Sequence, residues 1–184
     1  MRNLRYNCAT SLDGFIAPPD RTTNWIVNDP SIDFEALYAE FGTFILGRKT
    51  YEELKAQGEH NPLKSHSKDS VFVVSGTLRE EDCSEVTLIR DDIASRVRSL
   101  MEMDGKDIWL FGGAELAGLC LDAGLLTTIE VAIMPVLLQD GVKLMTGKKE
   151  SALKPKLELG SVNKLETGIL MCRYNVTYEV EQNH

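Results

Sequence analysis

The segment DIWLFGG, residues 107–113, constrains the fold of this chain more than any other stretch of its sequence. An apolar run ends in two adjacent glycines, and a helix-like pattern, AELAGLCLDAG, follows directly. Paired glycines let the backbone approach a ligand closely, and a helix after them directs free N–H groups and its positive dipole end at an anion. The segment therefore indicates a strand, an anion-binding turn and a helix, although a plain tight turn has the same pattern.

A second unit of this kind is TFILGRKTYEEL, residues 43–54, where an apolar run stops at Gly47 and Arg48, Lys49 and Thr50 follow. Cations at a helix N-terminus are unfavourable unless an anion neutralises them, and a phosphate ester would do so. Solvated surface cations with Thr50 as the N-cap are the alternative. Two such units suit a ligand with separated phosphates, such as a nicotinamide dinucleotide with a 2′-phosphate.

Strand-like and helix-like segments alternate along most of the chain. Strands are expected at 4–10, 71–75, 85–89, 107–111 and 128–134, and helices at 30–41, 91–103 and from the glycine pair to Gly124. From Pro155 onward the residues alternate as in an antiparallel hairpin, with Asn163 and Gly168 as turn residues. The pattern predicts a three-layer α/β/α sandwich, with a mostly parallel sheet and the hairpin at its edge.

The segment between the first strand and the first helix, residues 11–30, is a long loop that carries apolar residues and is therefore expected to be functional. The helix after it should be capped by Asp29 or Ser31 and places Asp33 and Glu35 on the flanks of its apolar stripe. Either carboxylate then borders a cleft beside the first strand, or is a solvated flank residue.

Composition excludes several classes of function. The chain has 184 residues, expected to form one domain over 1–184, and its net charge of −8 argues against a nucleic-acid partner. No apolar run is long enough for a membrane span or a signal peptide, so we expect a cytoplasmic protein. Four scattered cysteines and three histidines give no metal-ligand spacing, so we expect no metal.

The common nucleotide signatures G-x-G-x-x-G and G-x-x-x-x-G-K-[ST] are absent. Four other segments are informative: SLDGFIA at 11–17, FILGRKTYE at 44–52, VFVVSGT at 71–77 and the glycine pair. In this order and spacing they resemble the dihydrofolate reductase superfamily. Residues 107–145 most resemble the reductase domain of bacterial riboflavin biosynthesis, the RibD C-terminal group. The resemblance implies NADPH as cofactor and a homodimer.

The resemblance also assigns parts of the cofactor to positions of this chain. It implies that the 2′-phosphate and the adjacent pyrophosphate contact Gly47, Arg48, Lys49 and Thr50, and that the adenosine end contacts Ser75 and Gly76. The pyrophosphate and nicotinamide side would contact Gly112, Gly113, Ala114 and Glu115. The nicotinamide itself would contact Ala9 and Ile16. The loop from Ser11 would close over the reacting ring and exclude water.

For the chemistry, the resemblance implies one acidic residue on the first helix as proton donor, and Asp33 is the best match. Glu35 and Asp13 are alternatives, the latter also being read as an Asp-Gly turn residue. Trp25 and Phe34 would stack on a heteroaromatic substrate, together with Tyr38.

The expected function is NADPH-dependent hydride transfer to a small heteroaromatic substrate, in the manner of a 5-amino-6-(5-phosphoribosylamino)uracil reductase or a dihydrofolate reductase. Phe15 departs from the riboflavin reductases, in which a basic residue helps to hold the phosphorylated ribose chain, so the substrate stays open. A non-catalytic nucleotide-binding or regulatory protein on the same scaffold is the rival reading, and a reductase of an unrelated carbonyl or imine is a third.

Overall fold

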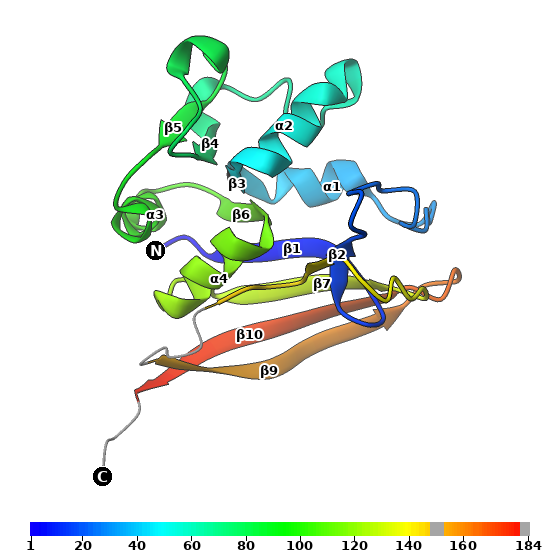
Figure 1. Cartoon of the computed structure of the whole chain (residues 1–184). Coiled ribbons are helices and arrows are strands. Elements are labelled where there is room, and N and C mark those ends of the chain that lie inside the picture. The colour runs from blue at the N-terminus through cyan, green and yellow to red at the C-terminus, as the bar shows by residue number, and fades with distance from the viewer. Residues whose placement is uncertain (148–152, 181–184) are drawn as a thin grey trace.

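The computed structural model describes residues 1–147 and 153–180, which build an eight-stranded central sheet (Figure 1). The strands of this sheet are β1 Leu4–Ser11, β3 Phe41–Gly47, β4 Val71–Val74, β5 Thr87–Ile89, β6 Asp107–Gly112, β7 Thr128–Met134, β9 Leu153–Lys164 and β10 Leu170–Val180. They lie in the order β5-β4-β3-β6-β1-β7-β10-β9, parallel from β5 to β7 and antiparallel from β7 to β9. The predicted mostly parallel sheet with an antiparallel C-terminal hairpin is confirmed.

Helices cover both faces of the sheet. They are α1 Phe34–Ala39, α2 Arg48–Ala56, α3 Ile93–Glu102 and α4 Ala114–Asp122, with the short 3-10 helices η1 Gly58–His60, η2 Lys68–Ser70 and η3 Glu80–Asp82. Because side chains alternate along a strand, β6 sends Ile108 and Leu110 to the face covered by α3 and α4. It sends Trp109 and Phe111 to the face covered by α1 and α2. This arrangement is the three-layer sandwich that the sequence predicted.

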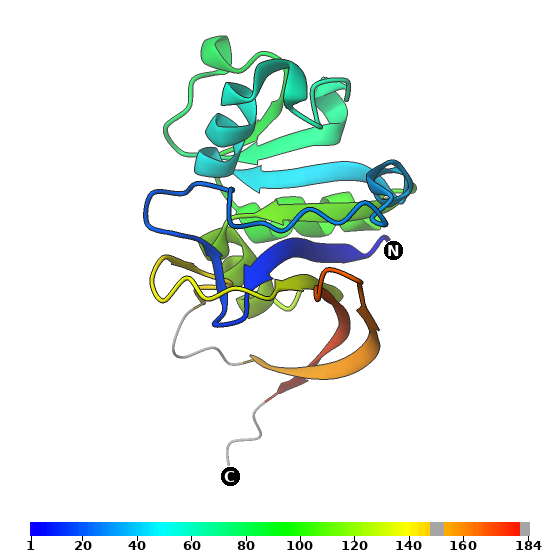
Figure 2. The same ribbon diagram turned by 90° about the vertical axis from the view of Figure 1, so that its right-hand side faces the viewer.

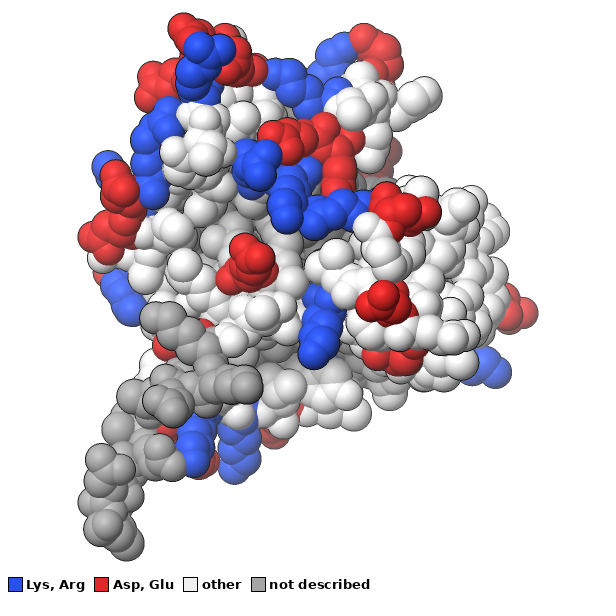
Figure 3. Space-filling model, viewed as in Figure 1, with Lys and Arg blue, Asp and Glu red and all other residues white. Residues whose placement is uncertain are grey.

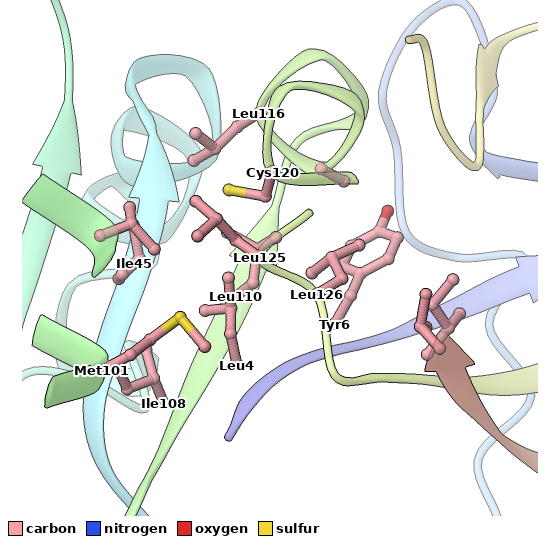
Figure 4. Close-up of a cluster of buried hydrophobic side chains, with 14 of the residues drawn as sticks. Leu4, Tyr6, Ile45, Met101, Ile108, Leu110, Leu116, Cys120, Leu125 and Leu126 are labelled. Carbon is pink, nitrogen blue, oxygen red and sulfur yellow. The ribbon is translucent and has the colours of Figure 1, made fainter. Parts of the chain in front are cut away.

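The larger hydrophobic core lies between the sheet and the pair α3 and α4. Its central side chains come from β1, β3, β6, both helices and the segment after α4, and they point toward one another (Figure 4). Leu4, Tyr6 and Leu110 are fully buried there. Burial of this apolar surface holds the central strands in place and so fixes the edge at which they all end.

The first helix is shorter than the sequence predicted. α1 begins at Phe34 instead of Pro30, and Phe41 already belongs to β3. The predicted cap at Asp29 or Ser31 is wrong, because the Asp29 carboxylate accepts bonds from the Ser31 N–H and hydroxyl and so holds a turn that competes with the helix. Asp33 is the N-cap, and its Oδ1 accepts from the Ala36 N–H at 2.9 Å.

The segment predicted as one long loop holds a short strand. β2 (Phe15–Ala17) pairs with β8 (Val142–Lys143) in a separate two-stranded sheet. Gly141 permits this pairing, because its φ is +140° and a Cβ there would lie 2.1 Å from the Ala17 carbonyl oxygen. A pairing between segments so far apart in the chain leaves no local sequence signal.

The C-terminal hairpin forms where the sequence placed it, with one error in its turn. Asn163, predicted as a turn residue, pairs with Met171 inside the ladder of β9 and β10. Gly168 does lie in the turn, with a φ of +87°. β9 forms the edge of the sheet at the opposite end from β5, as the two views show (Figure 1, Figure 2).

Candidate functional site

A cavity of about 1860 Å³ opens at the edge where the parallel strands end. It is lined by the last residues of β4, β3, β6 and β7, by β1 and β2, and by the first turns of α2 and α4. Ligand sites in α/β sheets form at this carboxyl edge. Because single-ligand pockets are usually about 300–1,000 Å³, the cavity has room for two ligands side by side.

The starts of α2 and α4 lie next to each other at this edge. Gly47 is the N-cap of α2 and Gly113 is the N-cap of α4. These two residues lie close together because β3 and β6 are adjacent and end together. A Cβ at Gly47 would lie 3.6 Å from the Gly113 nitrogen, and a Cβ at Gly113 would lie 3.8 Å from Thr50 Oγ1. Gly112 has a φ of +124°, which favours glycine. Two sets of free helix N–H groups therefore face the same cavity.

Two cations extend this anion-binding edge. Arg48 and Lys49 both line the cavity. Arg48 Nη1 lies 3.0 Å from Glu52 Oε1, and both side chains are more than 40 % exposed. Among the described residues no carboxylate lies within ion-pair distance of Lys49. Cations and acids stand side by side over α2 (Figure 3). Because an exposed pair contributes little, a ligand phosphate can compete with Glu52 for Arg48.

The turn after β4 forms the far wall of this end. The Ser75 hydroxyl accepts from the backbone N–H groups of Thr77 and Leu78, at 3.2 and 3.0 Å, and is therefore used in building the turn. Gly76 has open space around the position of a Cβ. Both residues line the cavity.

The other end of the cavity is apolar and aromatic. Its floor is Ala9 of β1, Ala132 of β7 and Met171 of β10, which are register partners on one face of the sheet. Its wall is formed by α1 and β6, where the rings of Tyr38 and Trp109 lie 4.8 Å apart. Burial raises the pKa of Tyr38 to about 12, so its hydroxyl stays protonated at neutral pH.

Every residue predicted to contact the cofactor lines this one cavity: Ala9, Ile16, Gly47, Arg48, Lys49, Thr50, Ser75, Gly76, Gly112, Gly113, Ala114 and Glu115. Phe34, predicted to contact the substrate, also lines it. The structure thus brings together segments that lie more than 100 residues apart in the chain.

Three predicted site residues are not on the cavity wall. Asp33 caps α1, as described above. Asp13 accepts from the Ser11 hydroxyl and from the N–H groups of Leu138 and Gln139, and these bonds lower its pKa. Trp25 lies in the neighbouring loop, and its buried Nε1 has no hydrogen-bond partner among the described residues.

Asn7 was not predicted as a site residue and Asp29 was predicted only as a helix cap, but both line the cavity. Asn7 lies two residues before Ala9, and period-2 alternation puts both side chains on one face, so a signal was present. Asp29 is 3 % exposed, and its carboxylate accepts from Ser31 and from Thr167 in the hairpin turn. The hydrogen bond from the Ser31 hydroxyl has the largest effect on the pKa of Asp29. Together these bonds lower that pKa to about 2, so the carboxylate is ionised at neutral pH.

The described part of the chain holds no cluster of three or more metal-ligating side chains. Cys8 lines the cavity, but burial raises the pKa of its thiol to about 12, which disfavours a thiolate nucleophile. Within the same residues, no helix has both the length and the apolar character needed to cross a bilayer.

A mostly parallel sheet between two helix layers, with adjacent helix N-termini over a cavity at its carboxyl edge, defines an α/β protein with the dihydrofolate reductase-like fold. Within this class the family is shown by sequence. The chain belongs to the RibD C-terminal domain family, because the sequence model of this family matches residues 2–171.

Individual relatives agree with this family. The uncharacterized protein YyaP of Bacillus subtilis (strain 168) is 28% identical over 186 residues, which cover 95% of each chain. Among solved structures, a putative riboflavin biosynthesis protein from Shewanella sp. PV-4 has a TM-score of 0.78 and 22% identity, covering 96% of this chain and 99% of that one.

Two further structures share the fold at lower identity. The diaminohydroxyphosphoribosylaminopyrimidine deaminase/5-amino-6-(5-phosphoribosylamino)uracil reductase of Thermotoga maritima has a TM-score of 0.69 and 16% identity, over 95% of this chain and 56% of that one. Dihydrofolate reductase from Enterococcus faecalis, complexed with NADP(H) and RAB-propyl, has a TM-score of 0.59 and 14% identity, over 98% and 97% of the two chains.

Proposed function

We propose that this protein is an NADPH-dependent reductase of a small heteroaromatic substrate. The observation that carries the proposal is the convergence of the α2 and α4 N-termini, with Arg48 and Lys49, at one end of a cavity large enough for two ligands. A dinucleotide with a pyrophosphate and a 2′-phosphate matches two helix N-termini and two cations at one end of the cavity. The NADP(H) complex of the similar Enterococcus faecalis enzyme and the reductase activity in the name of the Thermotoga maritima protein support it.

In this proposal the chain's own residues position the two reactants. Arg48, Lys49 and Thr50 hold the 2′-phosphate, and the backbone N–H groups after Gly112 hold the pyrophosphate. Ala9 and Ile16 contact the nicotinamide, which supplies the hydride when it is bound. The aromatic wall then holds the acceptor ring parallel to it, which supplies orientation. The proton donor stays a prediction, with Asp33 as its first candidate and Glu35 and Asp13 as alternatives.

Turnover tests the reductase activity. The loss of NADPH absorbance is followed with purified protein and, in turn, dihydrofolate and 5-amino-6-(5-phosphoribosylamino)uracil. The proposal expects a substrate-dependent loss of NADPH with at least one heteroaromatic ring. If NADPH binds tightly and no ring from a broad panel is reduced, the catalytic part of the proposal fails.

That second outcome would favour the rival function, a non-catalytic nucleotide-binding or regulatory protein on the same scaffold. One observation supports this rival: the carboxylate of Asp33 is hydrogen-bonded as a helix cap and does not line the cavity. The two functions share the cofactor site, and only turnover separates them.

We further propose that the protein forms a homodimer through β9. Leu157, Leu159 and Val162 are 50, 53 and 52 % exposed, and their cross-strand partners on β10 put them on one face. β9 is also an edge strand, whose unpaired backbone groups favour pairing with another strand. Light scattering of the wild type and of Leu159→Lys should give dimer and monomer masses. A monomeric wild type would contradict this assignment. A cytoplasmic location stays a prediction, to be tested by fractionation.

A further inference from the structure

The end of the cavity beside α1 is backed by a buried ionic network. Glu130 of β7 is 9 % exposed and Arg5 of β1 is 5 % exposed. Arg5 donates from Nε to Glu130 Oε1 at 2.8 Å and from Nη2 to Oε2 at 2.9 Å, while Arg173 Nε lies 3.5 Å from Oε1. A carboxylate held by two guanidinium groups is fixed in position and accepts hydrogen bonds only.

This network fixes the orientation of Asn7, which lines the cavity. Asn7 Nδ2 donates to Glu130 Oε2 at 2.9 Å. The reversed amide would set Oδ1 against an ionised carboxylate with no proton between them, so the assignment of the two amide atoms follows from chemistry. Within the described residues no donor bonds to Asn7 Oδ1. The site therefore presents a hydrogen-bond acceptor with a fixed direction.

Four cations line the cavity, namely Arg21, Arg48, Lys49 and Lys143. Arg48 and Lys49 begin α2, and Arg21 Nη1 lies 3.5 Å from Glu53 of the same helix. The fourth, Lys143, belongs to β8. Arg48 and Lys49 therefore lie at the α2 N-terminus that we assign to the cofactor, and Arg21 is paired with a carboxylate.

Lys143 lies in the separate two-stranded sheet that β8 forms with β2. The next residue, Leu144, accepts through its carbonyl from the Tyr6 hydroxyl at 2.7 Å, and Tyr6 belongs to the core covered by α3 and α4. The nearest cations behind the α1 end, Arg5 and Arg173, are both directed at Glu130. Among the described lining residues, therefore, no cation belongs to α1, β1 or β7, the elements around Asn7.

The charge that this end does carry is negative. Asp29 lines the cavity and is ionised at neutral pH, because Ser31 and Thr167 donate to its carboxylate. A substrate phosphate or carboxylate here would approach an anion with no cation to compensate it, which is unfavourable in a partly desolvated site.

We propose that the end of the cavity beside α1 binds an uncharged planar ring that donates an N–H group to Asn7 Oδ1 and carries no phosphate. Planarity follows from the slot between the aromatic side chains of Tyr38 and Trp109 and the floor of Ala9, Ala132 and Met171. The inference rests on the proposed function, because it takes the α2 and α4 end as the cofactor's. It makes Asn7 a residue that selects the substrate.

Ligand binding tests this without turnover. The Trp25→Phe variant leaves Trp109 as its one tryptophan, which lines the cavity and reports on it. Protein with and without NADP⁺ is titrated with three ligands. Lumazine is a neutral ring with N–H groups, and 5-amino-6-(ribosylamino)uracil and its 5′-phosphate differ only by the phosphate group.

Lumazine should bind, and the unphosphorylated member of the pair should bind at least about tenfold more tightly than its 5′-phosphate. Asn7→Ala should weaken lumazine binding about tenfold, the loss expected for a partly desolvated hydrogen bond. Asn7→Leu, which fills the space, should do the same. Asn175→Ala, at an exposed asparagine of β10 outside the cavity lining, should leave it unchanged.

Three results would overturn the inference: tighter binding of the 5′-phosphate to the wild type, unchanged lumazine affinity in both folded Asn7 variants, or no binding of either neutral ring with or without NADP⁺. NADPH affinity in the same variants shows that they are folded. Failure of the proposed function looks different, since neutral rings would still bind while NADPH would not.

Discussion

The carboxylate of Asp29 accepts a hydrogen bond of 2.6 Å from the hydroxyl of Thr167, which lies 138 residues further along the chain. The bond ties the loop that walls the substrate end of the cavity to the turn between β9 and β10. Asp29 also holds the two residues after it in a turn. The turn that precedes α1 is therefore held to the turn between β9 and β10.

Removal of this bond should destabilise the protein in a pH-dependent way. The folded-state pKa of Asp29, about 2, is below its ordinary value of 3.8, so the carboxylate contributes stability above pH 3.8 and loses it as pH falls toward 2. Thr167→Val should lower the melting temperature by about 2–4 °C at neutral pH, and the difference should shrink in acid. Thr177→Val, at an exposed position of β10, is the control. An equal effect at all pH values would contradict the account.

Arg48 should discriminate between the two nicotinamide dinucleotides. Arg48→Ala should weaken NADPH binding by about tenfold or more and leave NADH binding nearly unchanged, because the two differ only in the 2′-phosphate. Glu52→Gln removes the competing carboxylate, 3.0 Å from Arg48, and should strengthen NADPH binding. Fluorescence titration of the three proteins measures this. An equal loss for both dinucleotides in Arg48→Ala would refute the role of Arg48.

Gly118 is the position of closest backbone approach in α4. A Cβ there would lie 2.0 Å from the Thr146 carbonyl oxygen, so the helix and the segment after β8 would have to separate. Gly118→Ala should cost about 1–3 kcal/mol despite the better helix propensity of alanine. Gly76→Ala, where nothing lies within 4 Å of a Cβ, should be neutral in the same denaturant titration. A neutral Gly118→Ala would show that this packing is wrong.

Two substitutions of Asp33 separate a helix cap from a proton donor. An asparagine still accepts from the Ala36 N–H but has no carboxyl proton to donate, so with a reducible substrate Asp33→Asn should keep the stability and depress turnover. Asp33→Ala should depress turnover and also lose about 1 kcal/mol of stability. Turnover and thermal melts of both variants are the measurement. If Asp33→Asn folds normally and turnover is unchanged, Asp33 is a helix cap only and the proton donor is another residue.

The sheet and the cofactor end of the cavity were predictable because their signals are local. At Gly47 and Gly112 a strand, a glycine turn and a helix start follow one another within a dozen residues, and sheet geometry brings such turns together. Arg48 and Lys49, which the same reasoning singled out, line the cavity, and their contact with a phosphate stays a prediction.

The substrate end was less predictable because distant contacts shape it. The helix expected at 30–41 was cut short by the turn at Asp29, which Thr167 stabilises. As a result Asp33 caps the helix. The orientation of the Asn7 amide depends on Glu130, more than 100 residues away. No local pattern encodes such pairings.

The most direct test of the account is a titration of the Trp25→Phe protein with NADPH and with NADH, followed by the fluorescence of Trp109 in the cavity. We predict a dissociation constant for NADPH of about 1–10 μM, at least about tenfold below that for NADH, because Arg48 and Lys49 meet the 2′-phosphate. Equal affinity for both would remove the phosphate assignment. Binding of neither would mean that the glycine turns are structural and that the cofactor site does not exist.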